Sequence, residues 1–265
     1  MKAMDWPAWR RWLADTMGEA RGRHGFLLVD GRAFVEAPEV MAALPEAGGI
    51  SLWQGSLLES LKHIAPFLLP YDRLRPSDDD ALEVKVARRL WADEDRRYAL
   101  TWLCSHAPLH VIAAHLQRHT KVTREDGKQF YQHFYDNRIL HGLRSVWTAE
   151  QAQAFLGQVG YLCYERRPGL VERWEPAPSS DGKAASTEGL PQITFAQQEA
   201  LAMACSAGKM ALRLRTAAPG ALGSMSDAQL HARVDALFDE AMADGIHTPS
   251  EIYAFVRGVV LGRSA

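Results

Sequence analysis

The sequence predicts an α/β (α+β) N-terminal body with a mixed sheet, followed by a small all-helical C-terminal lobe. Short apolar runs, turn residues and amphipathic stretches fill residues 1–175, as expected of strands and helices that share one core. Residues 176–191 are rich in Pro, Ser, Ala and Gly, which indicates a flexible linker or long loop. From residue 192 onward the pattern is helical, so we expect a lobe at 192–265.

The first helix is expected to begin after Asp5, a helix-capping residue. Its aromatic stripe, which we interpret mainly as core packing, consists of Trp6, Trp9 and Trp12. The run 26–30 predicts a buried strand that ends in the turn pair Asp30-Gly31. The next expected elements are a helix or loop at 38–44, a strand at 50–53, a helix at 57–64 and an apolar strand at 65–70.

Residues 98–140 predict a strand, helix, strand, helix unit. The apolar run 98–104 suits a strand that is covered on both faces, and Pro108 then opens a helix with an inward apolar stripe. Aromatic residues alternate over 130–136, which predicts a second strand. Asp136-Asn137 is a turn and cap pair before the next helix.

The last part of the body predicts one helix and a closing strand pair. The helix is expected at 149–156, and the strands at 160–165 and 171–175 join at Pro168-Gly169. In the lobe, Gly245 is expected to end a helix. Three capping-box patterns begin lobe helices: Thr194 with Gln197, Ser226 with Gln229, and Thr248 with Glu251.

The composition limits the classes of partner. A formal net charge of −2 and scattered arginines offer no electrostatic footprint for nucleic acid. The three cysteines are widely spaced in apolar surroundings, so we expect a reducing cytoplasm without disulfides. We expect no secretory signal, because the N-terminus lacks an apolar core region. Residues 98–117 carry no formal charge and are long enough to span a bilayer, but three histidines and a mid-span Pro108 favour a buried strand and helix, so we expect no membrane insertion.

Histidines and one cysteine near residue 110 are the strongest candidates for chemistry. A helix advances about 100° per residue, which puts His115 beside His119 but turns His110 away. Zinc wants three or four protein ligands, so we interpret these histidines as polar-face or capping residues and expect no metal. Cys104 and His106 would point to the same side of a strand, but a thiol in an apolar run is usually inert.

The sequence contains no Walker loop, dinucleotide-binding fingerprint, nucleophile elbow or CxxC pair. These absences favour a binding protein over an enzyme, and we expect no cofactor. Two alternatives stay open: a hydrolase or transferase that uses Cys104 and His106, and a protein-interaction module of another kind.

The order of the motifs resembles the DUF4123 adaptors, or chaperones, of bacterial type VI secretion systems. The resemblance covers roughly residues 12–160 and lies in the early tryptophan helix, the Asp30-Gly31 turn, the segment with Pro66 and Phe67, the helix with His115, and the string Tyr135-Asp136-Asn137-Arg138. Family members typically have proline where this chain has Asn137.

The resemblance implies a non-catalytic role in the cytoplasm. Such adaptors bind a toxic effector in the producing cell and help to load it onto the secreted spike protein. On this basis Asp30, Asp136 and Arg138 are expected to fix turns and an internal ion pair, and Pro66 to set an extended segment. The positions Gly31, Phe67, His115 and Tyr135 complete the structural or partner-binding set.

Overall fold

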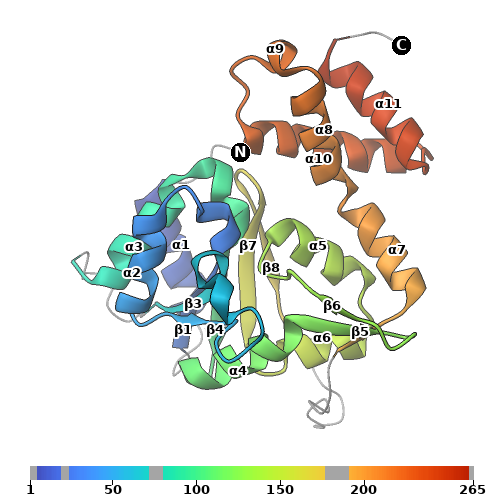
Figure 1. Cartoon of the computed structure of the whole chain (residues 1–265). Helices are drawn as coiled ribbons and strands as arrows, with labels where there is room; N and C mark the ends of the chain where they lie inside the picture. The colour runs from blue at the N-terminus through green and yellow to red at the C-terminus, as the bar shows by residue number, and fades with distance from the viewer. Residues whose placement is uncertain (1–4, 19–23, 72–79, 177–190, 263–265) are drawn as a thin grey trace.

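The computed structural model describes residues 5–18, 24–71, 80–176 and 191–262. It confirms the mixed α/β class with C-terminal helices. The large sheet and its helices form the lower part of the molecule in Figure 1, and the last helices stand above it. No helix among the described residues is long and apolar enough to cross a membrane.

The large sheet has six strands in the order β2-β3-β1-β4-β7-β8. Every neighbouring pair is antiparallel. In chain order the strands are β1 His24–Asp30, β2 Ile50–Ser51, β3 Pro66–Pro70, β4 Leu100–Ser105, β7 Tyr161–Arg167 and β8 Leu170–Trp174. The central strand β4 is buried along its whole length, as the unbroken apolar run predicts.

The mixed pairing that we expected in the main sheet occurs in a second, smaller sheet. Its order is β6-β5-β9, and β5 is antiparallel to β6 but parallel to β9. The strands are β5 Lys121–Arg124, β6 Gln129–Tyr131 and β9 Gln192–Ile193. The last strand comes after residues 177–190, so the chain returns to the body before the helical lobe begins.

Helices surround the large sheet. They are α1 Trp6–Gly18, η1 Gly31–Phe34, α2 Pro38–Glu46, η2 Glu59–Ile64, α3 Leu82–Ala92, η3 Glu94–Ala99, α4 Leu109–His119, α5 Asn137–Val146 and α6 Ala149–Leu156. The tryptophan stripe packs inward: Trp9 is buried, and its ring centroid lies 4.3 Å from that of Trp91 in α3. The expected helix at 57–64 is a 3-10 helix.

The strand expected at 130–136 is wrong in extent. Only residues 129–131 pair with β5, and all are exposed. Phe134 and Tyr135 are buried but lie in a turn before α5. Their rings pack on other elements, since the ring centroid of Phe134 lies 5.2 Å from that of Phe155 in α6. The alternating aromatic residues over 130–136 therefore reflect burial against other elements and not a pleated strand.

The C-terminal part contains α7 Phe195–Ala204, α8 Ser206–Ala217, α9 Pro219–Leu222, α10 Asp227–Ala243 and α11 Pro249–Val260. The capping boxes at Thr194 and Ser226 are confirmed, whereas at Thr248 the hydroxyl accepts from the Glu251 N–H and donates to the Glu251 carboxylate without completing a box. Gly245 has a φ of 81° and follows α10, as predicted.

The helices after α7 have their own core. Apolar side chains of α8, α9, α10 and α11 form this second cluster, separate from the cluster around the large sheet. Leu201 of α7 instead packs on the core of the body. Most of the predicted linker, at 176–191, lies outside the described residues.

Candidate functional site

Motif positions from two strands meet where β1 and β3 lie side by side. In the antiparallel register Asp30 faces Pro66, and Phe67 follows in the same strand. Gly31 lies so close to the neighbouring segment that an added Cβ would stand 2.3 Å from the carbonyl oxygen of Ala65. Glycine is therefore required here by a close backbone approach.

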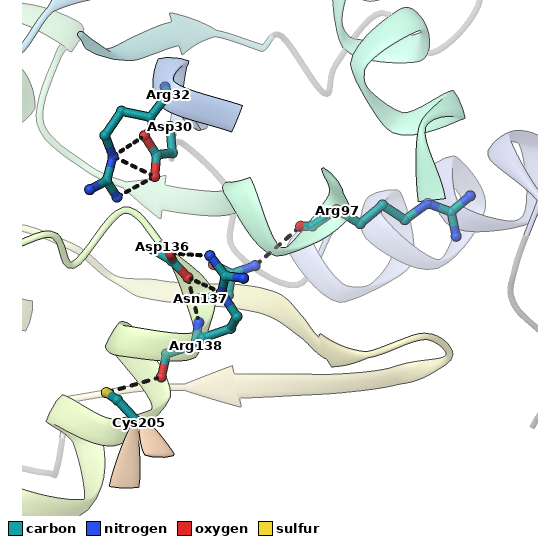
Figure 2. A network of polar contacts seen from close by, with 7 residues as sticks. All are labelled: Asp30, Arg32, Arg97, Asp136, Asn137, Arg138 and Cys205. Atoms are coloured by element: carbon teal, nitrogen blue, oxygen red, sulfur yellow. Dashed lines mark hydrogen bonds and ion pairs between the residues drawn. The ribbon is translucent and has the colours of Figure 1, made fainter. Parts of the chain in front are cut away.

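Two Asp-x-Arg clasps, Asp30–Arg32 and Asp136–Arg138, lie near this point (Figure 2). Each aspartate accepts a hydrogen bond from the backbone N–H two residues on, at 3.1 and 3.0 Å, and so caps the helix that follows. In both clasps arginine Nε donates to Oδ1 at 2.9 Å and Nη2 to Oδ2 at 2.6 Å. Bidentate, charge-assisted pairs of this kind are strong and geometrically specific.

Sequence reasoning found three of the four clasp residues and missed Arg32. The signal was present, because Asp30-Gly31-Arg32 and Asp136-Asn137-Arg138 share one Asp-x-Arg spacing. The expected internal ion pair is thus two local pairs, one on each turn.

Each clasp arginine also covers a tyrosine ring. Arg32 Cζ lies 5.2 Å from the ring centroid of Tyr135, and Arg138 Cζ lies 3.7 Å from that of Tyr98. Tyr135 directly precedes Asp136, so the first stack joins the two clasps. Burial raises the pKa of Tyr135 and keeps its phenol neutral. Burial alone would lower the pKa of Arg138, but its hydrogen bond to Asp136 and that residue's charge raise it overall.

Asn137 occupies the middle of the second clasp and is fully buried. Its Oδ1 accepts a hydrogen bond from Thr101 Oγ1 at 2.6 Å, and its Nδ2 donates to the carbonyl oxygens of Leu100 at 2.9 Å and Arg97 at 3.3 Å. The side chain therefore joins α5 to η3 and β4. Proline has no side-chain donor or acceptor and could not make these bonds. Asn137, where family members typically have proline, therefore adds a cross-link between α5, η3 and β4. The sequence alone gave no sign of it.

Of the α4 histidines, His110 is exposed, as the polar-face interpretation predicts, whereas that interpretation is wrong for His115 and His119, which face inward. His115 and His119 are both buried, with ring centroids 4.8 Å apart. His115 Nε2 lies 2.7 Å from the carbonyl oxygen of Phe155. Burial lowers the pKa of His115 and, together with the neighbouring His115, lowers the pKa of His119 to about 3. Both imidazoles are therefore neutral packing groups.

The two cysteines of the large sheet are also enclosed, whereas His106 is exposed. Cys104 is fully buried in β4. Burial raises the pKa of neighbouring Cys163 to about 12, which disfavours the nucleophilic thiolate. Within the described parts of the chain, no three His, Cys, Asp or Glu side chains gather as a metal ion would require.

Arg138 lies at the seam between the body and the helices of the lobe. Its neighbours line two cavities: one of about 60 Å³, whose lining includes Tyr98, Arg138 and His231, and one of about 270 Å³, whose lining includes Arg138, Cys205 and His231. Cys205 Sγ lies 3.9 Å from the carbonyl oxygen of Arg138 (Figure 2). Cys205, which precedes α8, and His231 of α10 thus cover the second clasp.

Ion pairs hold this seam. Arg166 and Arg167 of β7 contact Asp235 and Asp239 of α10, with Arg166 Nη2 at 2.9 Å from Asp239 Oδ2 and Arg166 Nε at 3.3 Å from Asp235 Oδ2. Asp95 of η3 accepts a hydrogen bond at 2.8 Å from the N–H of Ala228 in the first turn of α10. Sequence reasoning found none of these contacts, because they join residues far apart in the chain.

The fold and the clasps define a mixed α/β scaffold whose motif residues hold turns, ring stacks and a seam to added helices. Residues 25–154, just under half of the chain, match a family model described as "Domain of unknown function (DUF4123)". The motif positions from Asp30 to Arg138 lie inside this segment, the tryptophan helix precedes it, and the match supports assignment to the DUF4123 family. No curated protein and no solved structure matches the chain.

Proposed function

We propose that this protein is a non-catalytic adaptor that binds a type VI secretion effector in the producing cell and helps to load it onto the secreted spike protein. The observation that carries the proposal is the DUF4123 match over residues 25–154, which contains the motif positions from Asp30 to Arg138. The role itself rests on the resemblance to the type VI secretion adaptors.

The use of the motif residues supports a scaffold. The two clasp aspartates satisfy a helix N-terminus and an arginine each, so their oxygens are occupied within the fold. His115 and Tyr135 are buried neutral groups, and burial raises the pKa of the latter's phenol. A residue set that stabilises turns suits a protein that presents a surface to partners.

The two-core architecture also suits an adaptor. The body and the helices α8 to α11 each bury their own apolar cluster, and polar contacts link them across the seam. One protein can therefore offer separate surfaces to an effector and to a spike protein. We propose that it acts in the cytoplasm, without a cofactor, nucleic acid or membrane insertion.

Co-expression tests the proposal. The tagged adaptor is produced together with the products of neighbouring genes, and an effector should co-purify with it and gain solubility. A neighbouring spike protein should co-purify with the adaptor and the effector. The proposal fails if no neighbour encodes an effector or spike, or if none co-purifies or gains solubility.

The alternative of a hydrolase or transferase that uses Cys104 and His106 is tested separately. Because the thiol is enclosed in β4, Cys104→Ala should leave effector capture unchanged once the variant is shown to fold. Loss of capture by a folded Cys104→Ala variant would count against the adaptor role as proposed.

A further inference from the structure

Helix α2 carries more apolar surface than the core covers. Its buried side chains are Val40, Met41 and Leu44. A second stripe, at the i, i+3, i+4, i+7 spacing of one helical face, lines a cavity of about 450 Å³ and consists of Pro38, Met41, Ala42 and Pro45. The helix therefore has an apolar face that the described part of the chain leaves open.

The opposite wall comes from β3 and η2. Phe67 lies in the cavity wall, and Val35, with 54% of its surface exposed, stands at the rim. Lys62 and His63 of η2 complete the lining. We name this cavity the α2–η2 groove. Its volume is in the range of recognition clefts, which run from about 300 to 1,000 Å³.

The positive charge at the rim of the groove comes from Lys62. Lys62 and His63 are exposed, and the groove is lined by no carboxylate. Three carboxylates on adjoining segments have partners outside the groove: Glu36 with Arg96 at 2.9 Å, Glu39 with Arg89 at 2.6 Å, and Glu59 with the N–H of Gly55 at 3.0 Å. Glu46, at the end of α2, is exposed but does not line the groove. An apolar floor beside an uncompensated basic rim selects an occupant with apolar side chains and an adjacent negative charge.

We propose that the α2–η2 groove binds an apolar segment of the carried effector, with an acidic residue of that segment beside Lys62. This inference rests on the proposed adaptor function and adds the binding surface and the chemistry of the segment. It concerns residues that lie away from the clasps, so it can be tested without disturbing them.

The groove itself is tested with anilinonaphthalene sulfonate, a dye that joins apolar rings to one anionic group. Ala42→Glu places a carboxylate on the apolar stripe, and Lys62→Glu reverses the rim charge; both positions are exposed. We expect each variant to bind the dye about tenfold more weakly than the natural protein. The matched control is Ala254→Glu on the exposed side of α11, which should bind as before.

Effector capture is then measured with the same variants after circular dichroism has shown that they fold. Ala42→Glu and Lys62→Glu should lose most of the co-purifying effector, and Ala254→Glu should retain it. Equal capture by all variants would overturn the groove assignment and leave the adaptor function standing. If the natural protein captures no effector, the adaptor function fails and the effector assignment fails with it, whereas dye binding still reports on the groove.

Discussion

Gly31 and Asn137 hold the same middle position in the two clasps but serve opposite needs. Gly31 has no side chain because the Ala65 carbonyl oxygen occupies that space. Asn137 has a fully buried side chain that hydrogen-bonds to Thr101, Leu100 and Arg97. The middle position of the Asp-x-Arg motif is thus packed against a neighbouring backbone in the first clasp and forms a polar cross-link in the second.

Replacing Gly31 should be costly. In Gly31→Ala the new Cβ would meet backbone, which cannot move as a flexible side chain can, so we expect a loss of about 2–3 kcal/mol in the free energy of unfolding. Gly220→Ala in α9 is the control, since nothing lies within 4 Å of its added Cβ. Urea unfolding of both variants measures the difference. Equal stabilities would show that the β1–β3 junction relaxes freely.

The buried histidines predict an acid sensitivity. Burial keeps the folded pKa of His119 at about 3, below the ordinary value near 6.5, so the unfolded chain takes up the proton first as the pH falls. Its stabilisation is therefore complete above about pH 6.5 and declines toward pH 3, by about 2 kcal/mol at pH 5.

Urea unfolding at pH 7.5 and pH 5.0 tests this dependence. His119→Phe replaces the ring with one that cannot take a proton, in a site already edged by Phe155. This variant should lose less stability between the two pH values than the natural protein does. Parallel pH profiles for the two proteins would contradict the prediction.

At the scale of the elements, the ion pairs between β7 and α10 fix the lobe. Asp235→Ala would leave Arg166 and Arg167, which are both largely buried, with only the more exposed Asp239. We expect docking of α10 to weaken by about 2–3 kcal/mol. Hydrogen exchange should accelerate in α10 but not in β1. Asp244→Ala at the exposed end of α10 is the control, and unchanged exchange in the Asp235 variant would refute the role of the network.

The elements that the sequence predicted well are those whose signal is local. The turn residues around β1, the strand pair β7–β8 and helix α6 appear where patterning and caps put them. The segment 130–136 failed because Phe134 and Tyr135 are buried by distant side chains and not by a strand. The clasp role of Arg32 could have been predicted from its Asp-x-Arg spacing. The hydrogen bonds of Asn137 and the β7–α10 ion pairs could not, because they depend on residues far away in the sequence.

At the scale of the whole molecule, packing and composition divide the chain at different places. The composition changes at 176–191, whereas β9 pairs with β5 and α7 packs on α5 of the body. Gly142 allows this helix contact, since an added Cβ would stand 3.0 Å from Leu201 Cδ1. The second core begins with Ala207 in α8.

Two truncations distinguish these divisions. A chain ending at residue 205 keeps β9 and α7, and it should remain folded and soluble, although less stable than the full chain. A chain ending at residue 191 exposes the α5 surface and the edge of β5, so it should aggregate or unfold at lower temperature. Thermal melts and size-exclusion profiles compare them, and identical behaviour would favour the division by composition.

The parallel pairing of β9 with β5 also bears on how the protein is made. Thr123 lies opposite Gln192, so this strand cannot complete the small sheet until the polypeptide has been extended well past the large sheet on the ribosome. Contacts between distant parts of a chain form late and slowly. During translation the edge of β5 therefore stays unpaired until β9 has been synthesised. Pairing of this edge then occurs at about the time when the C-terminal helices are made.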